Sequence, residues 1–238
     1  MHSHPIPYCK VECKHCAVAR LCLPMTTEEI PEVVFDDVVN RKIILKAGNA
    51  LFRTNHPFKS FYAVRSGFLK SVLITKDGRE QITGFYFPGE LIGFDAVNSG
   101  YYNATLETLT DCEVCEISYG KMIELSNTTP SLQKHIIKLM SQRINHINCI
   151  RPNSQAKEKL ASFLLNFINR IDRPRQTQKT YTLPMKRSDI GNHIGLSAET
   201  VTRTLTILKQ ENILSCSGKT ITILDFRALQ IISCSTDD

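Results

Sequence analysis

Residues 186–214 constrain the fold more than any other segment, because they read as two short helices joined by a tight turn. The first helix is predicted at residues 188–194, and Gly195 after it can adopt the left-handed backbone conformation that such a turn needs. Ser197 is then placed to cap the second helix. This arrangement is typical of a helix-turn-helix.

The second helix of this motif is predicted to be amphipathic. At about 100° per residue, one side carries apolar residues that must face a core and the other carries polar residues that must face outward. The apolar set is Val201, Leu205 and Leu208, and the polar set is Glu199, Thr202, Arg203 and Thr206. A solvated surface is the ordinary explanation for such a polar set. The helix-turn-helix context favours another one, because the second helix of that motif enters the major groove of DNA.

The polar side has the chemistry that base edges require, since Arg can donate to guanine, Glu can accept from cytosine and Thr can contact the thymine methyl. The residues expected to contact double-stranded DNA are Glu199, Thr202, Arg203, Ser197 and Arg187. Two short strands around Ser217-Gly218 predict the wing of a winged helix. Lys186, Lys209 and Lys219 join Arg187 as candidate phosphate contacts. The net charge of +6 suits a polyanionic partner without identifying one.

Residues 42–118 have a different character. Glycines separate short stretches rich in Phe, Tyr, Val and Ile, which predicts short strands joined by tight turns and hence a β-roll or barrel. Asp77-Gly78 lies between two such stretches and predicts a hairpin with a type I′ turn, in which both central residues have positive φ.

Helical spacing follows the roll. Ile137, Met140, Ile144 and Ile147 are three or four residues apart and form an apolar seam on a helix that ends before Pro152. Two heptads fit either a dimer contact or a helix packed on its own domain, so both interpretations stay open. A further helix is predicted at residues 157–171 and a short strand at residues 181–185.

The cysteines near the N-terminus form a possible metal site. Cys13, Cys16 and Cys22 have the spacing C-x2-C-x5-C, so three thiolates can converge on one centre with a fourth ligand from elsewhere. The spacing matches neither ferredoxin pattern, and nearby histidines also suit zinc, so iron-sulfur and zinc are both open. No secretory signal and no apolar run long enough to cross a membrane are present, which makes the cytoplasm the expected compartment and a membrane an unexpected partner.

The segments SFYAVRSGFLKS, EQITGFYFPGELIGFDA and DIGNHIGLSAETVTRTL resemble the Crp-Fnr superfamily of transcription regulators, and within it the fumarate and nitrate reduction (FNR) regulators. The resemblance covers nearly the whole chain and implies an α+β fold: an N-terminal cyclic-nucleotide-binding-like β-roll, a long dimerisation helix and a C-terminal winged helix-turn-helix. The implied division is a cluster-binding segment at 1–28, a sensor roll at 29–128, the dimerisation helix at 129–152 and the DNA-binding domain at 157–238, with the helix-turn-helix at about 187–209.

The resemblance also implies a cofactor and a mechanism. FNR regulators hold a [4Fe-4S] cluster, and the matching ligands here are Cys13, Cys16, Cys22 and Cys115. Cys112 is expected on the opposite face of the same strand. The implied function is an oxygen-responsive activator and repressor that binds inverted TTGAT repeats as a homodimer while its cluster is intact. A regulator of the same fold that holds zinc or senses nitric oxide is the alternative.

Other expectations concern partners. Cyclic-AMP-binding relatives hold the nucleotide phosphate with an Arg-Ser pair, whereas residues 80–120 contain neither Arg nor Lys, so no cyclic nucleotide is expected. The turn at residues 76–79 is a candidate contact for RNA polymerase or an ordinary solvated turn. An electron carrier or a redox enzyme is disfavoured, because the chain has no dinucleotide-binding glycine motif. Ile147 replaces the acidic residue that FNR members can have there, which predicts tighter dimerisation without the cluster.

Overall fold

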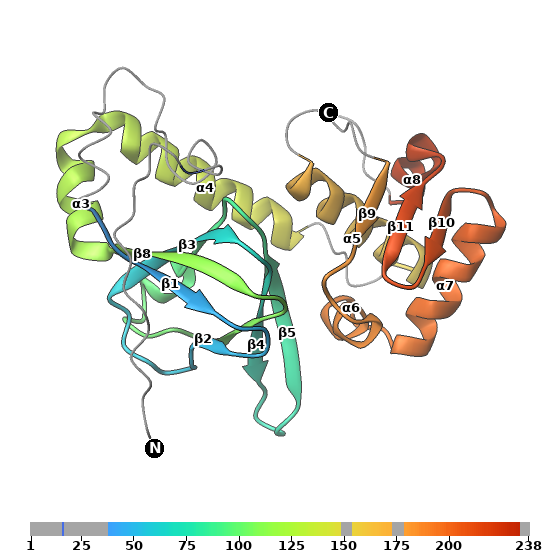
Figure 1. The fold of residues 1–238 in the computed structure, drawn as a ribbon, viewed down its shortest axis with the longest axis horizontal. Coiled ribbons are helices and arrows are strands. Elements are labelled where there is room, and N and C mark those ends of the chain that lie inside the picture. The colour runs from blue at the N-terminus through green and yellow to red at the C-terminus, as the bar shows by residue number, and fades with distance from the viewer. Residues whose placement is uncertain (1–15, 17–37, 149–153, 173–178, 234–238) are drawn as a thin grey trace. The chain divides into compact units, whose positions relative to one another are not determined.

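A computed structural model describes residue 16 and residues 38–148, 154–172 and 179–233 (Figure 1). The chain divides into two compact units, residues 1–143 and residues 144–238, with the boundary inside one long helix. Among the described residues, no helix combines the length and apolar character that a membrane span requires.

The first unit contains two four-stranded antiparallel sheets that form a β-roll, as the sequence predicted. One sheet has the order β1-β8-β3-β6, with bounds Val39–Leu45, Cys112–Ser118, Ser60–Ser66 and Leu91–Ile92. The other has the order β2-β7-β4-β5, with bounds Ala50–Phe52, Thr105–Thr108, Leu69–Ile74 and Glu80–Tyr86. A short 3-10 helix, η2 (Phe94–Ala96), follows β6.

Strand β8 separates two hydrophobic cores, because successive side chains of a strand point to opposite faces. Cys112 and Val114 belong to the core inside the roll, whereas Cys115 and Ile117 belong to the core on the other face. Two helices cover this second core, α3 (Tyr119–Thr128) and α4 (Pro130–Asn148). Helix α3 was not predicted, although the side chain of Ser118 caps it by accepting a hydrogen bond from the amide of Lys121.

The β4–β5 hairpin confirms the predicted reversal at Asp77-Gly78, but the predicted turn type is wrong. The amide of Gly78 donates to the carbonyl of Thr75 at 2.9 Å, and only Gly78 has positive φ, at 79°. Asp77 accepts hydrogen bonds from the Thr75 hydroxyl and the Arg79 guanidinium. These bonds close a wider loop in which a single left-handed glycine suffices, so Asp77 need not adopt the strained conformation of a type I′ turn.

The second unit is a small α+β domain whose sheet is antiparallel. Its helices are α5 (Ala156–Ile171), α6 (Arg187–Ile194), α7 (Ala198–Gln210) and α8 (Phe226–Ile232). Its sheet has the order β10-β11-β9, with bounds Leu214–Ser217, Thr220–Ile223 and Thr180–Thr182. Helix α8 was not predicted, and Asp225 caps it by accepting from the amide of Ala228 at 2.9 Å.

Candidate nucleic-acid interface and thiol site

The predicted helix-turn-helix is present as α6 and α7. Gly195 ends α6 with φ 71° and ψ 41°, which is the left-handed conformation expected of it. The turn passes so close to α6 that a Cβ built on Gly191 would lie 2.5 Å from the carbonyl oxygen of Leu196. Ser197 caps α7, because its hydroxyl accepts a hydrogen bond from the Thr200 amide at 3.0 Å. Two glycines and one cap therefore fix the angle between the helices.

Helix α7 has the two faces that its sequence predicted. Val201, Leu205 and Leu208 are buried, and the four polar residues Glu199, Thr202, Arg203 and Thr206 are exposed. Thr204 is also buried, which the apolar periodicity did not indicate. Its hydroxyl is satisfied within the helix by donating to the carbonyl of Thr200 at 2.8 Å. The exposed face is free of core packing and available to a ligand.

The predicted wing is formed by β10 and β11, which turn at Gly218 with φ 58°. Arg187, at the start of α6, donates to the carbonyl of Gly218 at 2.8 Å. The amide of Leu183 donates to the carbonyl of Lys219 at 2.9 Å. Partial burial lowers the pKa of Arg187. Arg187 therefore joins the wing to the helix-turn-helix, and its predicted contact with DNA stays a prediction.

Basic residues flank this motif. The side chains of three lysines are exposed, as candidate phosphate contacts must be: Lys186 just before α6, Lys209 on α7 and Lys219 on the wing. Lys157 forms an ion pair with Glu211 at 2.6 Å, which connects the start of α5 to the end of α7. This unit thus has exposed lysines in the helix-turn-helix region and on the wing.

The second candidate site is centred on Cys115. This residue lies on β8, the strand bonded to both β1 and β3, and it is opposite Lys42 and Ala63. Its thiol is buried beneath α3 and α4. Burial and, to a smaller extent, the Cys16 thiol raise the pKa of Cys115 to about 11, although the cations Arg65 and Lys42 act to lower it. Cys16, from the N-terminal segment, therefore acts on the Cys115 thiol electrostatically.

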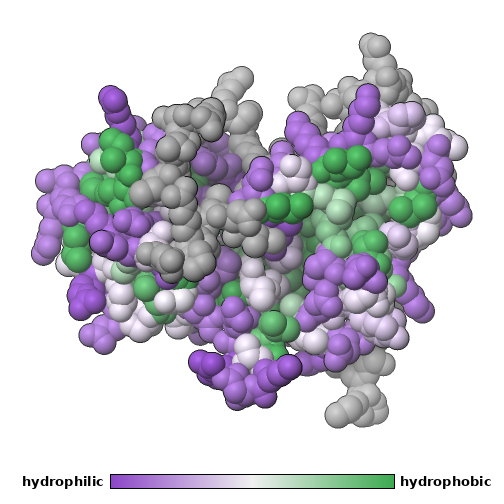
Figure 2. Space-filling view, turned by 180° about the vertical axis from the view of Figure 1, so that it is seen from behind, coloured by the Kyte–Doolittle hydropathy of each residue, from purple (hydrophilic) through white to green (hydrophobic). Residues whose placement is uncertain are grey.

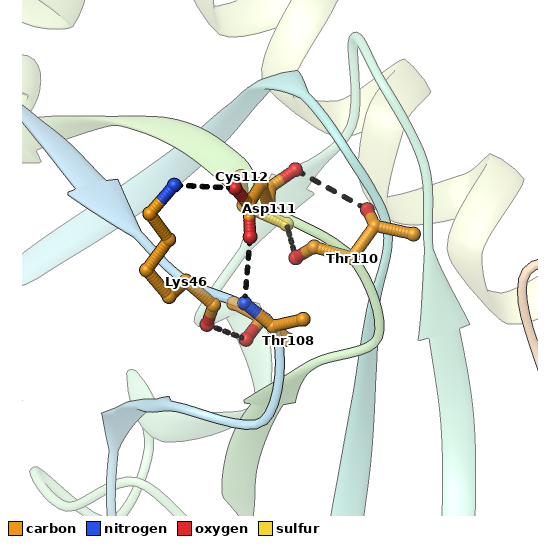
Figure 3. A network of polar contacts seen from close by, with 6 residues as sticks. Lys46, Thr108, Thr110, Asp111 and Cys112 are labelled. Carbon is orange, nitrogen blue, oxygen red and sulfur yellow. Dashed lines mark hydrogen bonds and ion pairs between the residues drawn. The ribbon is translucent and has the colours of Figure 1, made fainter.

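Cys112 is placed differently, as predicted. Its side chain lies in the core inside the roll, and its thiol donates to the carbonyls of Thr110 at 3.2 Å and Phe68 at 3.4 Å. Figure 3 shows the thiol pointing toward Thr110 beside the ion pair between Lys46 and Asp111. Burial raises the pKa of Cys112. The Cys112 thiol is accordingly packed in the core inside the roll, with hydrogen bonds to backbone carbonyls.

The remaining predicted ligands, Cys13 and Cys22, lie outside the described residues. Within the described part of the chain, no three His, Cys, Asp or Glu residues gather as a metal site would require. The two predicted ligands that are described, Cys16 and Cys115, interact electrostatically. They make up half of the expected ligand set, and cysteine thiolates are the ligands that hold iron-sulfur clusters.

Helix α4 carries the predicted apolar seam. Ile137, Met140 and Ile144 are exposed, by 66%, 43% and 56%. The side chain of Ile147, the fourth predicted member, lies outside the described residues. Figure 2 shows that hydrophobic side chains reach the molecular surface in several places among hydrophilic ones. The seam on α4 differs from single exposed side chains because its members lie on one helix face.

Comparison with known proteins agrees with this architecture. Residues 42–129 match the cyclic nucleotide-binding domain family, and residues 158–232 match the Crp-like helix-turn-helix domain family. The structure of FixK2 from Bradyrhizobium japonicum superposes with a TM-score of 0.72 at 24% identity, covering 82% of this chain and 98% of that one. At this identity, the likeness concerns the fold.

Relatives matched by sequence share more identical residues with this chain than FixK2 does. The fumarate and nitrate reduction regulatory protein of Escherichia coli (strain K12) is 36% identical over 93% of this chain and 90% of its own length. Electron transport regulator A of Shewanella oneidensis is 35% identical over 94% of this chain and 91% of its own length. A Crp-like helix-turn-helix binds DNA, and regulators of this kind act as dimers. The chain therefore belongs to the Crp/Fnr family of transcription regulators.

Proposed function

We propose that this chain is an oxygen-responsive global regulator that binds inverted TTGAT-type operators as a homodimer when Cys13, Cys16, Cys22 and Cys115 hold a [4Fe-4S] cluster. It activates or represses according to operator position, in the cytoplasm where chromosomal DNA lies. The observation that carries the proposal is the position of Cys115, which lies on the central strand β8 and faces the core that α3 and α4 cover. Relatives named fumarate and nitrate reduction regulatory proteins support it.

The roll contributes one fixed ligand in this proposal. Cys115 lies on a central strand that is hydrogen-bonded on both sides, so its position is set by the sheet. Because its pKa is about 11, the thiol is protonated at neutral pH and must lose that proton to become a ligand. The other three ligands come from residues 1–28. When bound, the cluster supplies an oxygen-labile connection between this segment and the roll.

Packing links Cys115 to the proposed dimerisation helix, residues 129–152. Cys115 shares its core with Leu132, Ile136 and Leu139 of α4. A change in the packing around Cys115 therefore alters the core contacts of α4. We assign the seam formed by Ile137, Met140, Ile144 and Ile147 to contact with a second copy of the chain, since a two-fold dimer brings the same residues of both copies together.

In such a dimer, the two α7 helices enter successive major grooves about 34 Å apart, which requires an inverted-repeat operator. Glu199, Thr202 and Arg203 would contact bases. Ser197 and Arg187 would contact the backbone near the start of each helix. The hairpin tip at residues 76–79, with its exposed charges, is the proposed contact with RNA polymerase.

The roll would act without a cyclic nucleotide. Its interior contains aromatic side chains, including Phe52 stacked on Tyr102 with ring centroids 3.8 Å apart. The Tyr102 hydroxyl donates to the buried carbonyl of Ser60 at 2.6 Å. Residues 80–120 contain no Arg or Lys that would neutralise a buried phosphate.

The test compares the wild type with Cys115→Ser and with Cys112→Ser, a matched control that makes the same change on the opposite face of β8. Each protein is prepared without oxygen, its iron and sulfide are measured, and an inverted TTGAT repeat is footprinted before and after air. The wild type and the control should contain iron and sulfide and protect the operator only before air. Full iron content and full protection by anaerobic Cys115→Ser would refute the proposal.

The same experiment separates the alternatives. A zinc site would give a colourless protein whose operator protection survives air. A nitric oxide sensor would release the operator on addition of nitric oxide and keep it in air. The spacing of the N-terminal cysteines, which does not itself select iron, motivates this comparison.

A further inference from the structure

Helix α4 has an inner face as well as the exposed seam. Leu132, Ile136 and Leu139 pack against the core beneath the helix. Arg143 follows Leu139 by four residues, so the inner residues are spaced by four, three and four along the helix. An arginine therefore occupies the position that follows these three apolar residues at the same spacing.

The guanidinium of Arg143 packs against two residues of strand β5 in the roll. Its guanidinium carbon lies 4.4 Å from the centroid of the Tyr86 ring, which is the distance of a cation–π contact. Tyr86 is buried and ends strand β5. Two residues earlier on the same strand is Gly84, where a Cβ would lie 2.7 Å from an Nη atom of Arg143. The absence of a side chain at Gly84 thus leaves room for the guanidinium.

The geometry points to Arg143 as a positioning residue that fixes the rotation of α4 on the roll and so presents the Ile137–Met140–Ile144 face to a second copy of the chain. This inference rests on the proposed function, in which that face is the dimer contact. The reason is geometric. Among the described residues, Leu139 is the last residue of α4 in that core, and Arg143 contacts the roll one turn further along, next to Ile144.

The inference explains why an arginine suits this position. A methionine or leucine would pack on Tyr86 without a preferred direction, whereas a cation is drawn to the face of the ring. The long stem of Arg reaches across from the helix, and its head needs the space that Gly84 leaves. The ring of Tyr86, the charge of Arg143 and the space at Gly84 thus all contribute to one contact.

Three variants of the full chain test the role of Arg143. Arg143→Met keeps the stem and removes the charge, and Arg143→Lys keeps a cation above the ring. Gly84→Ala leaves Arg143 unchanged but places a methyl group where the guanidinium packs. The methyl group clashes with the movable end of the Arg143 side chain rather than with backbone. The dimer dissociation constant of the cluster-free protein is measured by sedimentation equilibrium, and the Tm is measured in parallel.

We expect Arg143→Met and Gly84→Ala each to raise the dissociation constant about tenfold, and Arg143→Lys to restore most of the affinity. The Tm should change little, which separates positioning from a general loss of stability. An unchanged dissociation constant in both Arg143→Met and Gly84→Ala overturns the inference. Ile137→Ala is measured beside them: if it weakens dimerisation and the Arg143 variant does not, only this inference fails, and if it has no effect, the assigned dimer face fails first.

Discussion

Replacing Ile144 by Ala tests the assignment of the exposed α4 face to a dimer contact. Full burial of an isoleucine side chain contributes about 1.5 to 3 kcal/mol. Ile144 is 56% exposed in the single chain, so covering it by a partner removes roughly half of that amount from water, about 1 kcal/mol. A two-fold dimer contains the contact twice, so Ile144→Ala should weaken dimerisation by about 2 kcal/mol, or roughly 30-fold in Kd.

Sedimentation equilibrium of the cluster-free protein measures this change directly, and a matched control is available. Ile231 on α8 is 70% exposed, more than Ile144, and lies outside the proposed contact. Ile231→Ala should leave the Kd within about twofold of the wild type, because a surface substitution away from the interface costs little. Equal small effects of both substitutions would refute the assignment, since exposure alone would then account for Ile144.

Three further substitutions probe the helix-turn-helix. Ser197→Ala removes the cap of α7 and should lower the free energy of unfolding by about 1 kcal/mol, measured by urea titration. Leu208→Ala, at a fully buried position, should lower it by about 2 to 5 kcal/mol in the same assay. Thr202→Val should keep operator affinity within about threefold in a binding titration, because the Thr202 hydroxyl already donates to the carbonyl of Ala198 at 2.9 Å and its hydrogen is not available to a base. A loss of more than tenfold with Thr202→Val would mean that the hydroxyl itself is read.

The sequence predicted the DNA-binding half of the fold in detail because each signal there is local. Gly195 and Ser197 set the turn within a few residues of each other, and the faces of α7 follow from helical periodicity. The missed elements are short. Helices α3 and α8 have 10 and 7 residues and, unlike the short helix α6, belong to no recognisable motif, so only a short periodic pattern and the caps at Ser118 and Asp225 could have indicated them.

Contacts between residues distant in sequence could not be predicted from local patterns. The bond from Arg187 to Gly218 joins residues 31 apart, and the contact of Arg143 with Tyr86 joins a helix to a strand. The placement of Cys115 and Cys112 on opposite faces of β8 was predictable, because alternation along a strand is local. A link between Cys16 and Cys115 was implied only by resemblance to FNR regulators.

The hydroxyls of α7 have a consequence for how this helix meets water. Thr202, Thr204 and Thr206 each donate to the carbonyl four residues earlier, at 2.9, 2.8 and 3.1 Å. Their hydroxyl hydrogens are thus used within the helix, and the exposed threonines offer a methyl group and oxygen lone pairs to their surroundings. A helix surface that looks hydrophilic in sequence is therefore partly hydrocarbon in chemistry, and less bound water has to leave when it meets another molecule.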